Sequence, residues 1–165
     1  VDDDQTKNAW CMPGGKIAFY SGILPIAKNK DGIASIMGHE IAHAVARHSA
    51  ERASTAMLTD FGIMALEKFV LGQRLPQASG YVRQFGLDLP FNRKQESEAD
   101  YLGIIFSSLA GYNIEESYKV WERMKEETGS GPTEFWSTHP SPDNRIKKLK
   151  EWIPIVSRQY PAISV

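Results

Sequence analysis

Apolar residues recur at helical spacing in several stretches of the chain, and Gly, Pro and Ser residues separate these stretches. The pattern predicts a first helix of about 18 residues, with Asp31 as its N-cap. Further helices are expected at 53–71, at 92–110 with Gly111 just past the end, at 114–127, and from Ser141 as N-cap with Pro142 at the first position.

The stretch 53–71 has an unusually dense apolar face. Its members are Met57, Leu58, Phe61, Ile63, Met64, Leu66, Phe69 and Val70. A buried core helix is the simpler interpretation, and a face that docks on a membrane surface or a partner is the alternative. Charged residues interrupt it, so no uncharged run of about 18 apolar residues exists and we expect no transmembrane helix.

A small sheet is expected only near the N-terminus, where NAWCMPGGKIAFY (8–20) reads as two short strands around a Pro-Gly-Gly turn. Residues 72–91 carry two prolines and three glycines without periodicity, which predicts a long loop and a candidate cleft loop. The expected fold is therefore α+β, mostly helical, with one domain over 1–165. Because the chain begins at Val1, we interpret it as a fragment of a longer precursor.

The amino-acid composition excludes few classes of function. The formal net charge of −1 gives no global field that would attract nucleic acid or an anionic membrane. A single cysteine, Cys11, excludes an internal disulfide.

The stretch GHEIAHAVARH (38–48) carries the first candidate chemistry. Residues four apart on a helix differ by about 40° around its axis, so His39 and His43 project from one face and can converge on one metal ion. Glu40 leans toward the same edge and can reach a metal-bound water without being a ligand. This is the H-E-x-x-H arrangement of zinc peptidases.

A third histidine, His48, follows His43 by five residues, about 140° away on an ideal helix. The long metzincin pattern would need Gly and His where this chain has Ala46 and Ser49. We therefore expect His48 to lie on the surface or in the last helical turn and not to be a ligand.

The third ligand is expected in ESEAD (96–100). Glu96 and Asp100 are four apart and share a helix face, whereas Glu98 points away from both. Glu96 can bind the metal while Asp100 accepts a hydrogen bond from the far nitrogen of a ligand histidine, with His39 the expected partner. The alternative is a salt-bridged acidic patch at a helix N-terminus.

HEIAH followed by ESEAD resembles the gluzincin zinc metallopeptidases, the family of HtpX, the CAAX prenyl proteases, BepA and the Oma-type proteases. Further stretches also match the family: NAWCMPGGKIAFYSGIL, GHEIAHAVARHSAER, FNRKQESEAD and THPSPDNRI. The chain looks nearest to the soluble BepA-like and Oma-like catalytic domains. The resemblance implies a zincin-type, minigluzincin-like catalytic domain with an active-site helix.

Carried onto this sequence, the resemblance implies that His39, His43 and Glu96 bind one zinc ion. Glu40 would be the general base, and Asp100 would support the ligands. It also implies roles for residues outside these motifs. His139 would stabilise the oxyanion or occupy the open coordination position as a gate, and Arg145 would position or neutralise that region. Asn8, Ala9 and Trp10 would form the edge strand along which a substrate lies.

The expected activity is a zinc-dependent endopeptidase acting on misfolded or unassembled proteins of an envelope or membrane setting. The alternative is a zinc-containing peptide-binding or chaperone-like module whose site is self-gated and seldom cleaves. Proteins or peptides are the expected partners, with a peripheral membrane or membrane-protein contact left open and nucleic acid excluded. The resemblance favours a bacterial cell envelope location.

Overall fold

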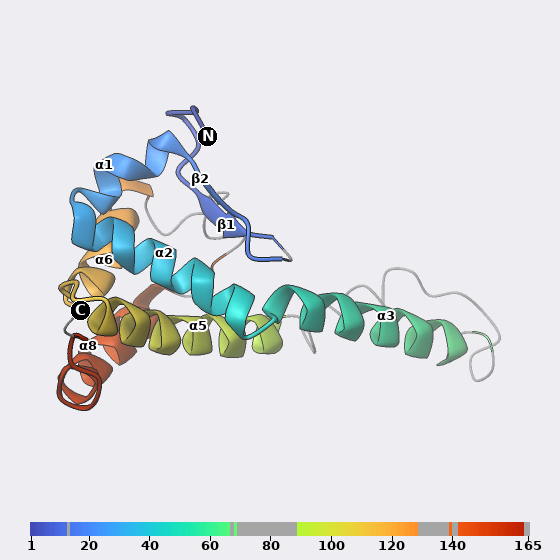
Figure 1. Ribbon diagram of the computed structural model, residues 1–165. Coiled ribbons are helices and arrows are strands. Elements are labelled where there is room, and N and C mark those ends of the chain that lie inside the picture. Colours follow the sequence, from blue (N-terminus) through green and yellow to red (C-terminus); the bar gives the residue numbers. More distant parts are fainter. Residues whose placement is uncertain (13, 67, 69–88, 129–138, 140–141, 164–165) are drawn as a thin grey trace.

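The computed structural model describes residues 1–12, 14–66, 68, 89–128, 139 and 142–163, and its helices dominate (Figure 1). The expected α+β, mostly helical class is confirmed. The elements are β1 (Ala9–Cys11), β2 (Ile17–Phe19), the 3-10 helix η1 (Ser21–Ile23), α1 (Leu24–Ala27), α2 (Lys30–Val45), α3 (His48–Leu66), α5 (Leu89–Leu109), α6 (Glu116–Thr128) and α8 (Pro142–Gln159).

Helix α2 begins two residues earlier than the pattern predicts, because its N-cap is Asn29 and not Asp31. The Asn29 side chain accepts a hydrogen bond of 2.9 Å from the Gly32 amide and satisfies a donor that the helix leaves open. Asp31 lies in the first turn, where its carboxylate accepts a hydrogen bond from the amide of Asn113 instead.

The other end of α2 also departs from the prediction. The helix stops at Val45, and Arg47 adopts a left-handed conformation with φ of 58°. This turn ends the helix without a glycine and lets a second helix, α3, begin at His48. The predicted start of the second helix at residue 53 is therefore five residues late.

Helices α2 and α5 lie side by side and cross closely (Figure 1). A methyl group added at Gly38 would lie 2.8 Å from the Gly103 carbonyl oxygen, and one added at Gly103 would lie 2.9 Å from the His39 amide nitrogen. Only hydrogen fits at these two positions, so the helix backbones can touch. This contact brings the H-E-x-x-H segment next to the segment 96–100.

The core fills the space between α2, α5, α6 and α8, with η1 and α1 closing one end. Its fully buried members include Ile23, Val120, Met124, Leu149 and Val156. Trp121 is buried and Trp152 packs half-buried against the core.

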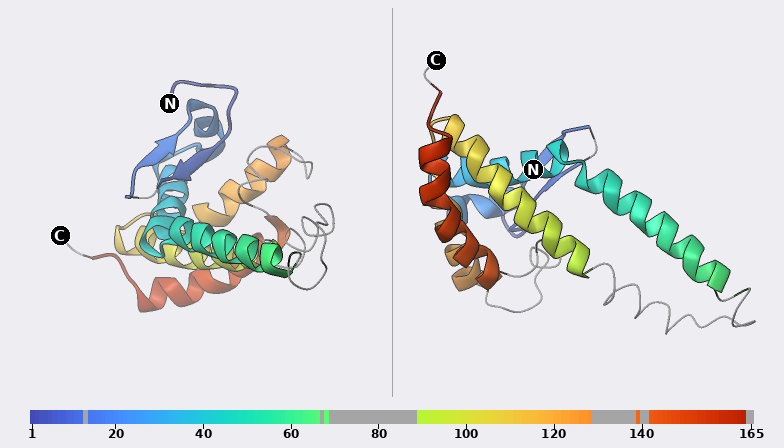
Figure 2. Two further views of the ribbon diagram at one scale, coloured as in Figure 1. Left: turned by 90° about the vertical axis from the view of Figure 1, so that its right-hand side faces the viewer. Right: turned by 90° about the horizontal axis from the view of Figure 1, so that it is seen from below.

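Helix α3 projects away from this body (Figures 1 and 2). Met57, Leu58 and Phe61 are at least 70% exposed and Met64 is 54% exposed, so the core interpretation is wrong for these members of the face. Phe69, Val70 and the side chain of Leu66 lie outside what the structure describes. The apolar spacing alone could not predict burial, because it specifies which residues share a helix face and not what packs against that face. Docking on a membrane surface or a partner stays a hypothesis.

The N-terminal strands pair as the sequence predicts, with Ala9 opposite Phe19 and Cys11 opposite Ile17. Gly14 and Gly15 supply the positive φ angles of the turn. The amide of Tyr20 donates to the carbonyl of Asn8, and the amide of Met12 donates to the carbonyl of Lys16. The antiparallel alternation therefore directs the backbone groups of Ala9 and Cys11 to the outer edge of β1.

Two further expectations fall partly outside the described residues. Positions 72–88 of the predicted cleft loop and the N-cap Ser141 are not described, but 89–91 belong to α5, so the loop prediction is wrong at its end. Gly111 follows α5 with φ of 80°, as predicted for a C-terminal glycine.

Among the described helices, none is both long and apolar enough to cross a membrane.

We predict that Gly103→Ala destabilises the protein, because the added methyl would press on helix backbone that cannot rotate away. Overpacking of this kind costs about 1–3 kcal/mol, more than the roughly 1 kcal/mol that alanine gains over glycine in a helix. The melting temperature measures the effect. Gly62→Ala is the control, since a methyl there meets nothing within 4 Å. It should leave the melting temperature unchanged or raise it, and an equal loss in both variants would contradict the crossing argument.

Candidate metal centre

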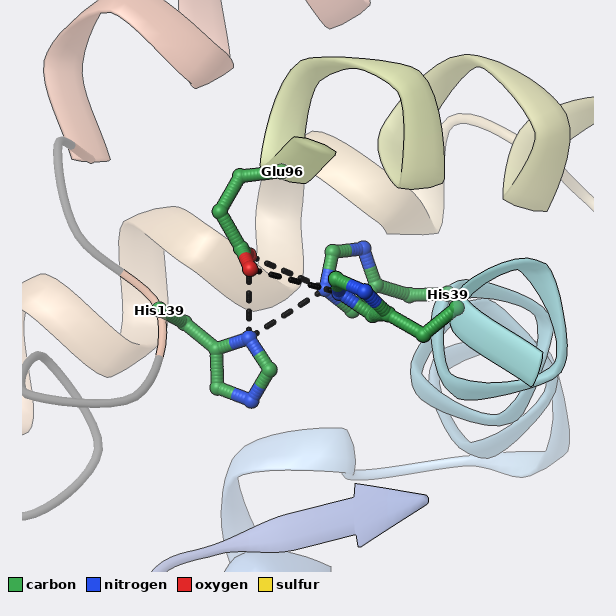
Figure 3. Close-up of side chains that lie close together, drawn as sticks. His39, Glu96 and His139 are labelled. Atoms are coloured by element: carbon green, nitrogen blue, oxygen red, sulfur yellow. Dashed lines mark hydrogen bonds and ion pairs between the residues drawn. The ribbon is translucent and has the colours of Figure 1, made fainter. Parts of the chain in front are cut away.

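Four buried side chains from three parts of the chain converge at the crossing of α2 and α5 (Figure 3). They are His39 and His43 from α2, Glu96 from α5, and His139. One ligand atom from each lies within 4.8 Å of the others, so the four could hold a metal ion. The geometry brings together the residues expected as ligands and adds His139 to them, while their assignment as ligands stays a prediction.

The individual contacts show where the ligand atoms point. The Nε2 atoms of His39 and His43 lie 3.1 Å apart. The two oxygens of Glu96 face these nitrogens at 3.2 Å and 3.3 Å. His139 turns its Nδ1 into the same cluster, 2.9 Å from Glu96 and 3.3 Å from His39. Nitrogen and oxygen donors thus surround one point, as a tetrahedral ion requires.

The charge of the buried cluster suits a divalent cation. Glu40, Glu96 and Asp100 are three buried carboxyl groups, and Arg145 is one buried guanidinium, which leaves two negative charges when all are ionised. An uncompensated buried charge is costly, so a cluster of this kind needs a cation or protons. The donor set and the charge therefore both fit a divalent metal ion.

Without a metal, bound protons compensate part of this negative charge. Burial disfavours a charged His39 ring, but hydrogen bonds to Asp100 and Glu96 outweigh burial and raise the pKa of His39 to about 9. Burial lowers the pKa of His43 to about 3, so its ring is neutral at physiological pH. Burial would raise the pKa of Glu96, yet the neighbouring histidines, with His139 first, hold it well below its usual value.

Asp100 lies where the sequence predicts, with its Oδ1 3.1 Å from the Nδ1 of His39. Arg145, from α8, donates one hydrogen bond of 2.7 Å to each oxygen of this carboxylate. The guanidinium also lies 3.2 Å from Glu96 and stacks over the Trp121 ring at 4.1 Å. Arg145 and Asp100 thus hold the His39 ring on its Nδ1 side, and Trp121, which no motif signals, packs against the guanidinium.

Glu40 is buried next to the cluster without joining it. Its carboxylate lies 3.6 Å from the Nε2 of His139. Burial raises the pKa of Glu40, and the nearby His139 and His39 only partly offset this effect. A carboxyl group with a raised pKa beside a metal site is a candidate proton acceptor.

The expected substrate strand borders the same cluster. The carbonyl oxygen of Ala9 lies 3.5 Å from the Nε2 of His139, on the outer edge of β1. Asn8 is buried and its side chain accepts a hydrogen bond from the Ala9 amide. Trp10 is half-buried, with its indole donating to Tyr20 at 3.4 Å. Of the three residues, Ala9 therefore contacts the cluster, with Asn8 and Trp10 as its chain neighbours. Contact of all three with a substrate stays a prediction.

The expectation that His48 lies on the surface or in the last turn of its helix is wrong. His48 is buried, and its Nδ1 lies 2.9 Å from the Nδ1 of His43, on the side of that ring away from the cluster. The 140° separation on an ideal helix does not apply, because α2 ends before His48 and the Arg47 turn redirects the chain. Glu98 points away from the cluster, as predicted, with its side chain 52% exposed.

Comparison with protein families places this chain in a known family. Peptidase family M48 matches residues 1–153, so the chain belongs to this family. The resemblance inferred from the motifs is therefore confirmed. No solved structure gives a significant match.

Individual relatives agree with this assignment. The chain is 43% identical to the mitochondrial metalloendopeptidase OMA1 of Schizosaccharomyces pombe, over 92% of this chain and 45% of the relative. It is 30% identical to the human metalloendopeptidase OMA1, over 93% of this chain and 32% of the relative. A putative beta-barrel assembly-enhancing protease of Vibrio cholerae is also 30% identical, over 98% of this chain and 35% of the relative. The chain thus spans less than half of each of these relatives.

These relatives correct the expected location. The OMA1 proteins of Schizosaccharomyces pombe, Saccharomyces cerevisiae, Arabidopsis thaliana and human are mitochondrial by name, and bacterial proteases match alongside them. A bacterial envelope location is therefore not favoured. The expectation failed because the catalytic motifs are shared between both groups and contain no targeting information.

We predict that zinc binding releases protons. Below a pKa of about 9, His39 of the metal-free protein holds a proton that a metal must displace, so zinc affinity should rise about tenfold per pH unit from pH 6.5 to 8. Titration calorimetry in buffers of different ionisation enthalpy counts the released protons. At least one is expected at pH 7, and heats independent of the buffer would contradict a proton on His39.

Proposed function

We propose that this chain is a zinc-dependent endopeptidase domain that hydrolyses internal peptide bonds of protein substrates. The observation that carries the proposal is the buried cluster of His39, His43, Glu96 and His139, with Glu40 beside it. Membership of a peptidase family and the metalloendopeptidase names of several relatives support the same reaction class.

Zinc is proposed because two imidazoles and one carboxylate form a common catalytic zinc site with one open position. When bound, zinc polarises the scissile carbonyl and lowers the pKa of its water molecule. His39 and His43 would bind through Nε2 and Glu96 through its carboxylate, since these atoms face one another. Asp100 and Arg145 would keep the His39 ring in the orientation that binding requires.

Glu40 is the proposed general base. Its raised pKa lies nearer to neutrality than that of an exposed carboxyl group, which suits a residue that must both accept and return a proton. Glu40 would take the proton of the attacking water and deliver it to the departing amine. The carbon–nitrogen bond then breaks without leaving an amide anion.

The position of His139 supports a second candidate function. Its Nδ1 already points into the ligand cluster, as a fourth ligand would. A zinc ion with four protein ligands has no open position, which favours a self-gated module that binds peptides and seldom cleaves. The alternative role is stabilisation of the oxyanion after His139 turns away from the cluster.

The outer edge of β1 is the proposed substrate site. An extended peptide could pair with the backbone of Cys11 there, next to Ala9 and His139. Asn8 and Trp10 would flank it. Main-chain pairing selects extended segments and not a particular sequence, so misfolded or unassembled membrane-associated proteins stay the predicted substrate class.

Casein hydrolysis by zinc-loaded protein tests the proposal. We predict that Glu40→Gln lowers kcat by about 10²–10⁴-fold and keeps its zinc, because the loss is that of a proton acceptor and not of a ligand. Glu115→Gln, in which an exposed carboxylate in the turn before α6 is replaced in the same way, is the control and should retain full activity. Metal analysis gives the zinc content, and mass spectrometry gives the cleavage positions.

The variant His139→Ala separates the two candidate functions. A loss of about 10²–10³-fold in kcat supports the oxyanion role and the endopeptidase. A silent wild type that gains activity in His139→Ala supports the gate. Terminal instead of internal cleavage would contradict the endopeptidase assignment, and a wild type that holds no zinc would contradict the metal centre.

A further inference from the structure

We propose that the first turn of α3 positions two metal ligands: His48 holds the ring of His43, and Arg52 holds the carboxylate of Glu96. The inference rests on the proposed metal centre and adds two residues to which we have so far assigned no role. Both belong to the same helical turn, whereas the ligands that they contact come from α2 and α5.

The His43 ring is held on two opposite sides. Its Nε2 faces His39 and Glu96 in the cluster. Its Nδ1, on the far side of the ring, lies 2.9 Å from the Nδ1 of His48, and the two rings meet edge to face at 4.9 Å between centroids. His48 is 2% exposed, so water does not replace this contact easily.

The proton positions along this pair follow from the ligand role. A ring nitrogen that binds a metal carries no proton, so neutral His43 must carry its proton on Nδ1 and donate it to His48. His48 accepts with Nδ1 and therefore carries its own proton on Nε2, which faces the carboxylate of Glu98 at 3.6 Å. Every donor in the series then points to an acceptor, and the His43 tautomer is fixed.

The two ligand histidines thus have separate supports. Asp100 contacts the Nδ1 of His39, and His48 contacts the Nδ1 of His43. Partners of this kind fix the tautomer and orientation of metal-binding imidazoles, and their loss typically costs about 10–100-fold in metal affinity.

Arg52 makes the second contact of the turn. Its Nη2 lies 3.2 Å from the Oε1 of Glu96, the oxygen that also faces His43. Its Nε donates to the side chain of Gln95 at 2.5 Å, and Gln95 donates in turn to Glu51 at 2.7 Å. Arg145 contacts the other oxygen of Glu96. Two guanidinium groups therefore hold this carboxylate, one at each oxygen.

The turn at Arg47 makes both contacts available. Since α2 stops at Val45, α3 can start beside the N-terminal half of α5, where Gln95 and Glu96 lie (Figure 1). A helix continuing through residue 48 would have directed His48 away from His43. The local backbone conformation, not the helical spacing, brings His48 behind its neighbour.

Zinc affinity tests the role of His48 without relying on catalysis. His48→Leu removes the acceptor, whereas His48→Asn keeps one, because the Asn Oδ1 takes the place of the histidine Nδ1. Competition with a chromogenic chelator gives the zinc Kd, and the visible spectrum of the cobalt-substituted protein reports ligand geometry. We expect His48→Leu to weaken zinc binding about 10–100-fold and to shift the cobalt spectrum. His48→Asn should bind within a few-fold of wild type.

Arg52→Met gives an independent test, because its half-exposed side chain can be changed without opening the core. We expect a measurable loss of zinc affinity and an unchanged melting temperature of the metal-free protein. Arg158→Met, which removes an exposed cation at the end of α8, is the matched control and should bind zinc like wild type.

The outcomes separate this proposal from the proposed function. If wild type binds zinc but His48→Leu and Arg52→Met bind it equally well, the first turn of α3 does not position the ligands and the proposal fails. Equal losses in His48→Asn and His48→Leu would also overturn the role of His48 as an acceptor. If His48→Leu does not fold, the other two variants decide. His48→Asn with wild-type affinity and Arg52→Met with weakened affinity support the proposal. His48→Asn with weakened affinity and Arg52→Met with wild-type affinity refute it. A wild type without zinc affinity overturns the proposed function itself.

Discussion

At the crossing of α2 and α5 the backbones lie so close that neither Gly38 nor Gly103 has room for a methyl group. This contact fixes the distance between the histidines of α2 and the carboxylates of α5, and ligand atoms tolerate only small errors in such distances. The hydrogen bond between His39 and Asp100 and the contacts of Glu96 with both histidines span the same crossing. The candidate metal centre therefore depends on two residues that have no chemistry of their own.

Burial of charge is the second constraint. Glu96 and Asp100 have lost their water, and each is held ionised by cations and ring nitrogens, with Arg145 contacting both. Such a cluster costs stability unless every charge has a partner. A divalent ion meets that requirement, and in its absence a proton on His39 meets part of it. The arrangement that destabilises the empty site is thus the one that favours metal binding.

Helix α3 combines two parts with different surroundings. Its first turn is packed against the metal centre through His48 and Arg52, while Met57, Leu58 and Phe61 further along are exposed. One helix therefore carries both an exposed apolar face and the contacts to two proposed ligands. The hydrophobic spacing could not reveal this division, because burial is decided by what packs against a helix and not by its sequence.

The sequence by itself determined the mostly helical class, the hairpin and the pairs of candidate ligands that helical spacing groups together. His39 and His43 are one turn apart on any helix, as are Glu96 and Asp100, so local geometry alone groups each pair. The family motifs added His139 and Arg145, which local geometry could not connect to the site. Only the tertiary structure decided that these groups meet, that α2 ends at Val45 and that His48 lies behind His43. These features depend on contacts between residues distant in sequence and on a left-handed turn at Arg47, a residue type that gives no signal for it.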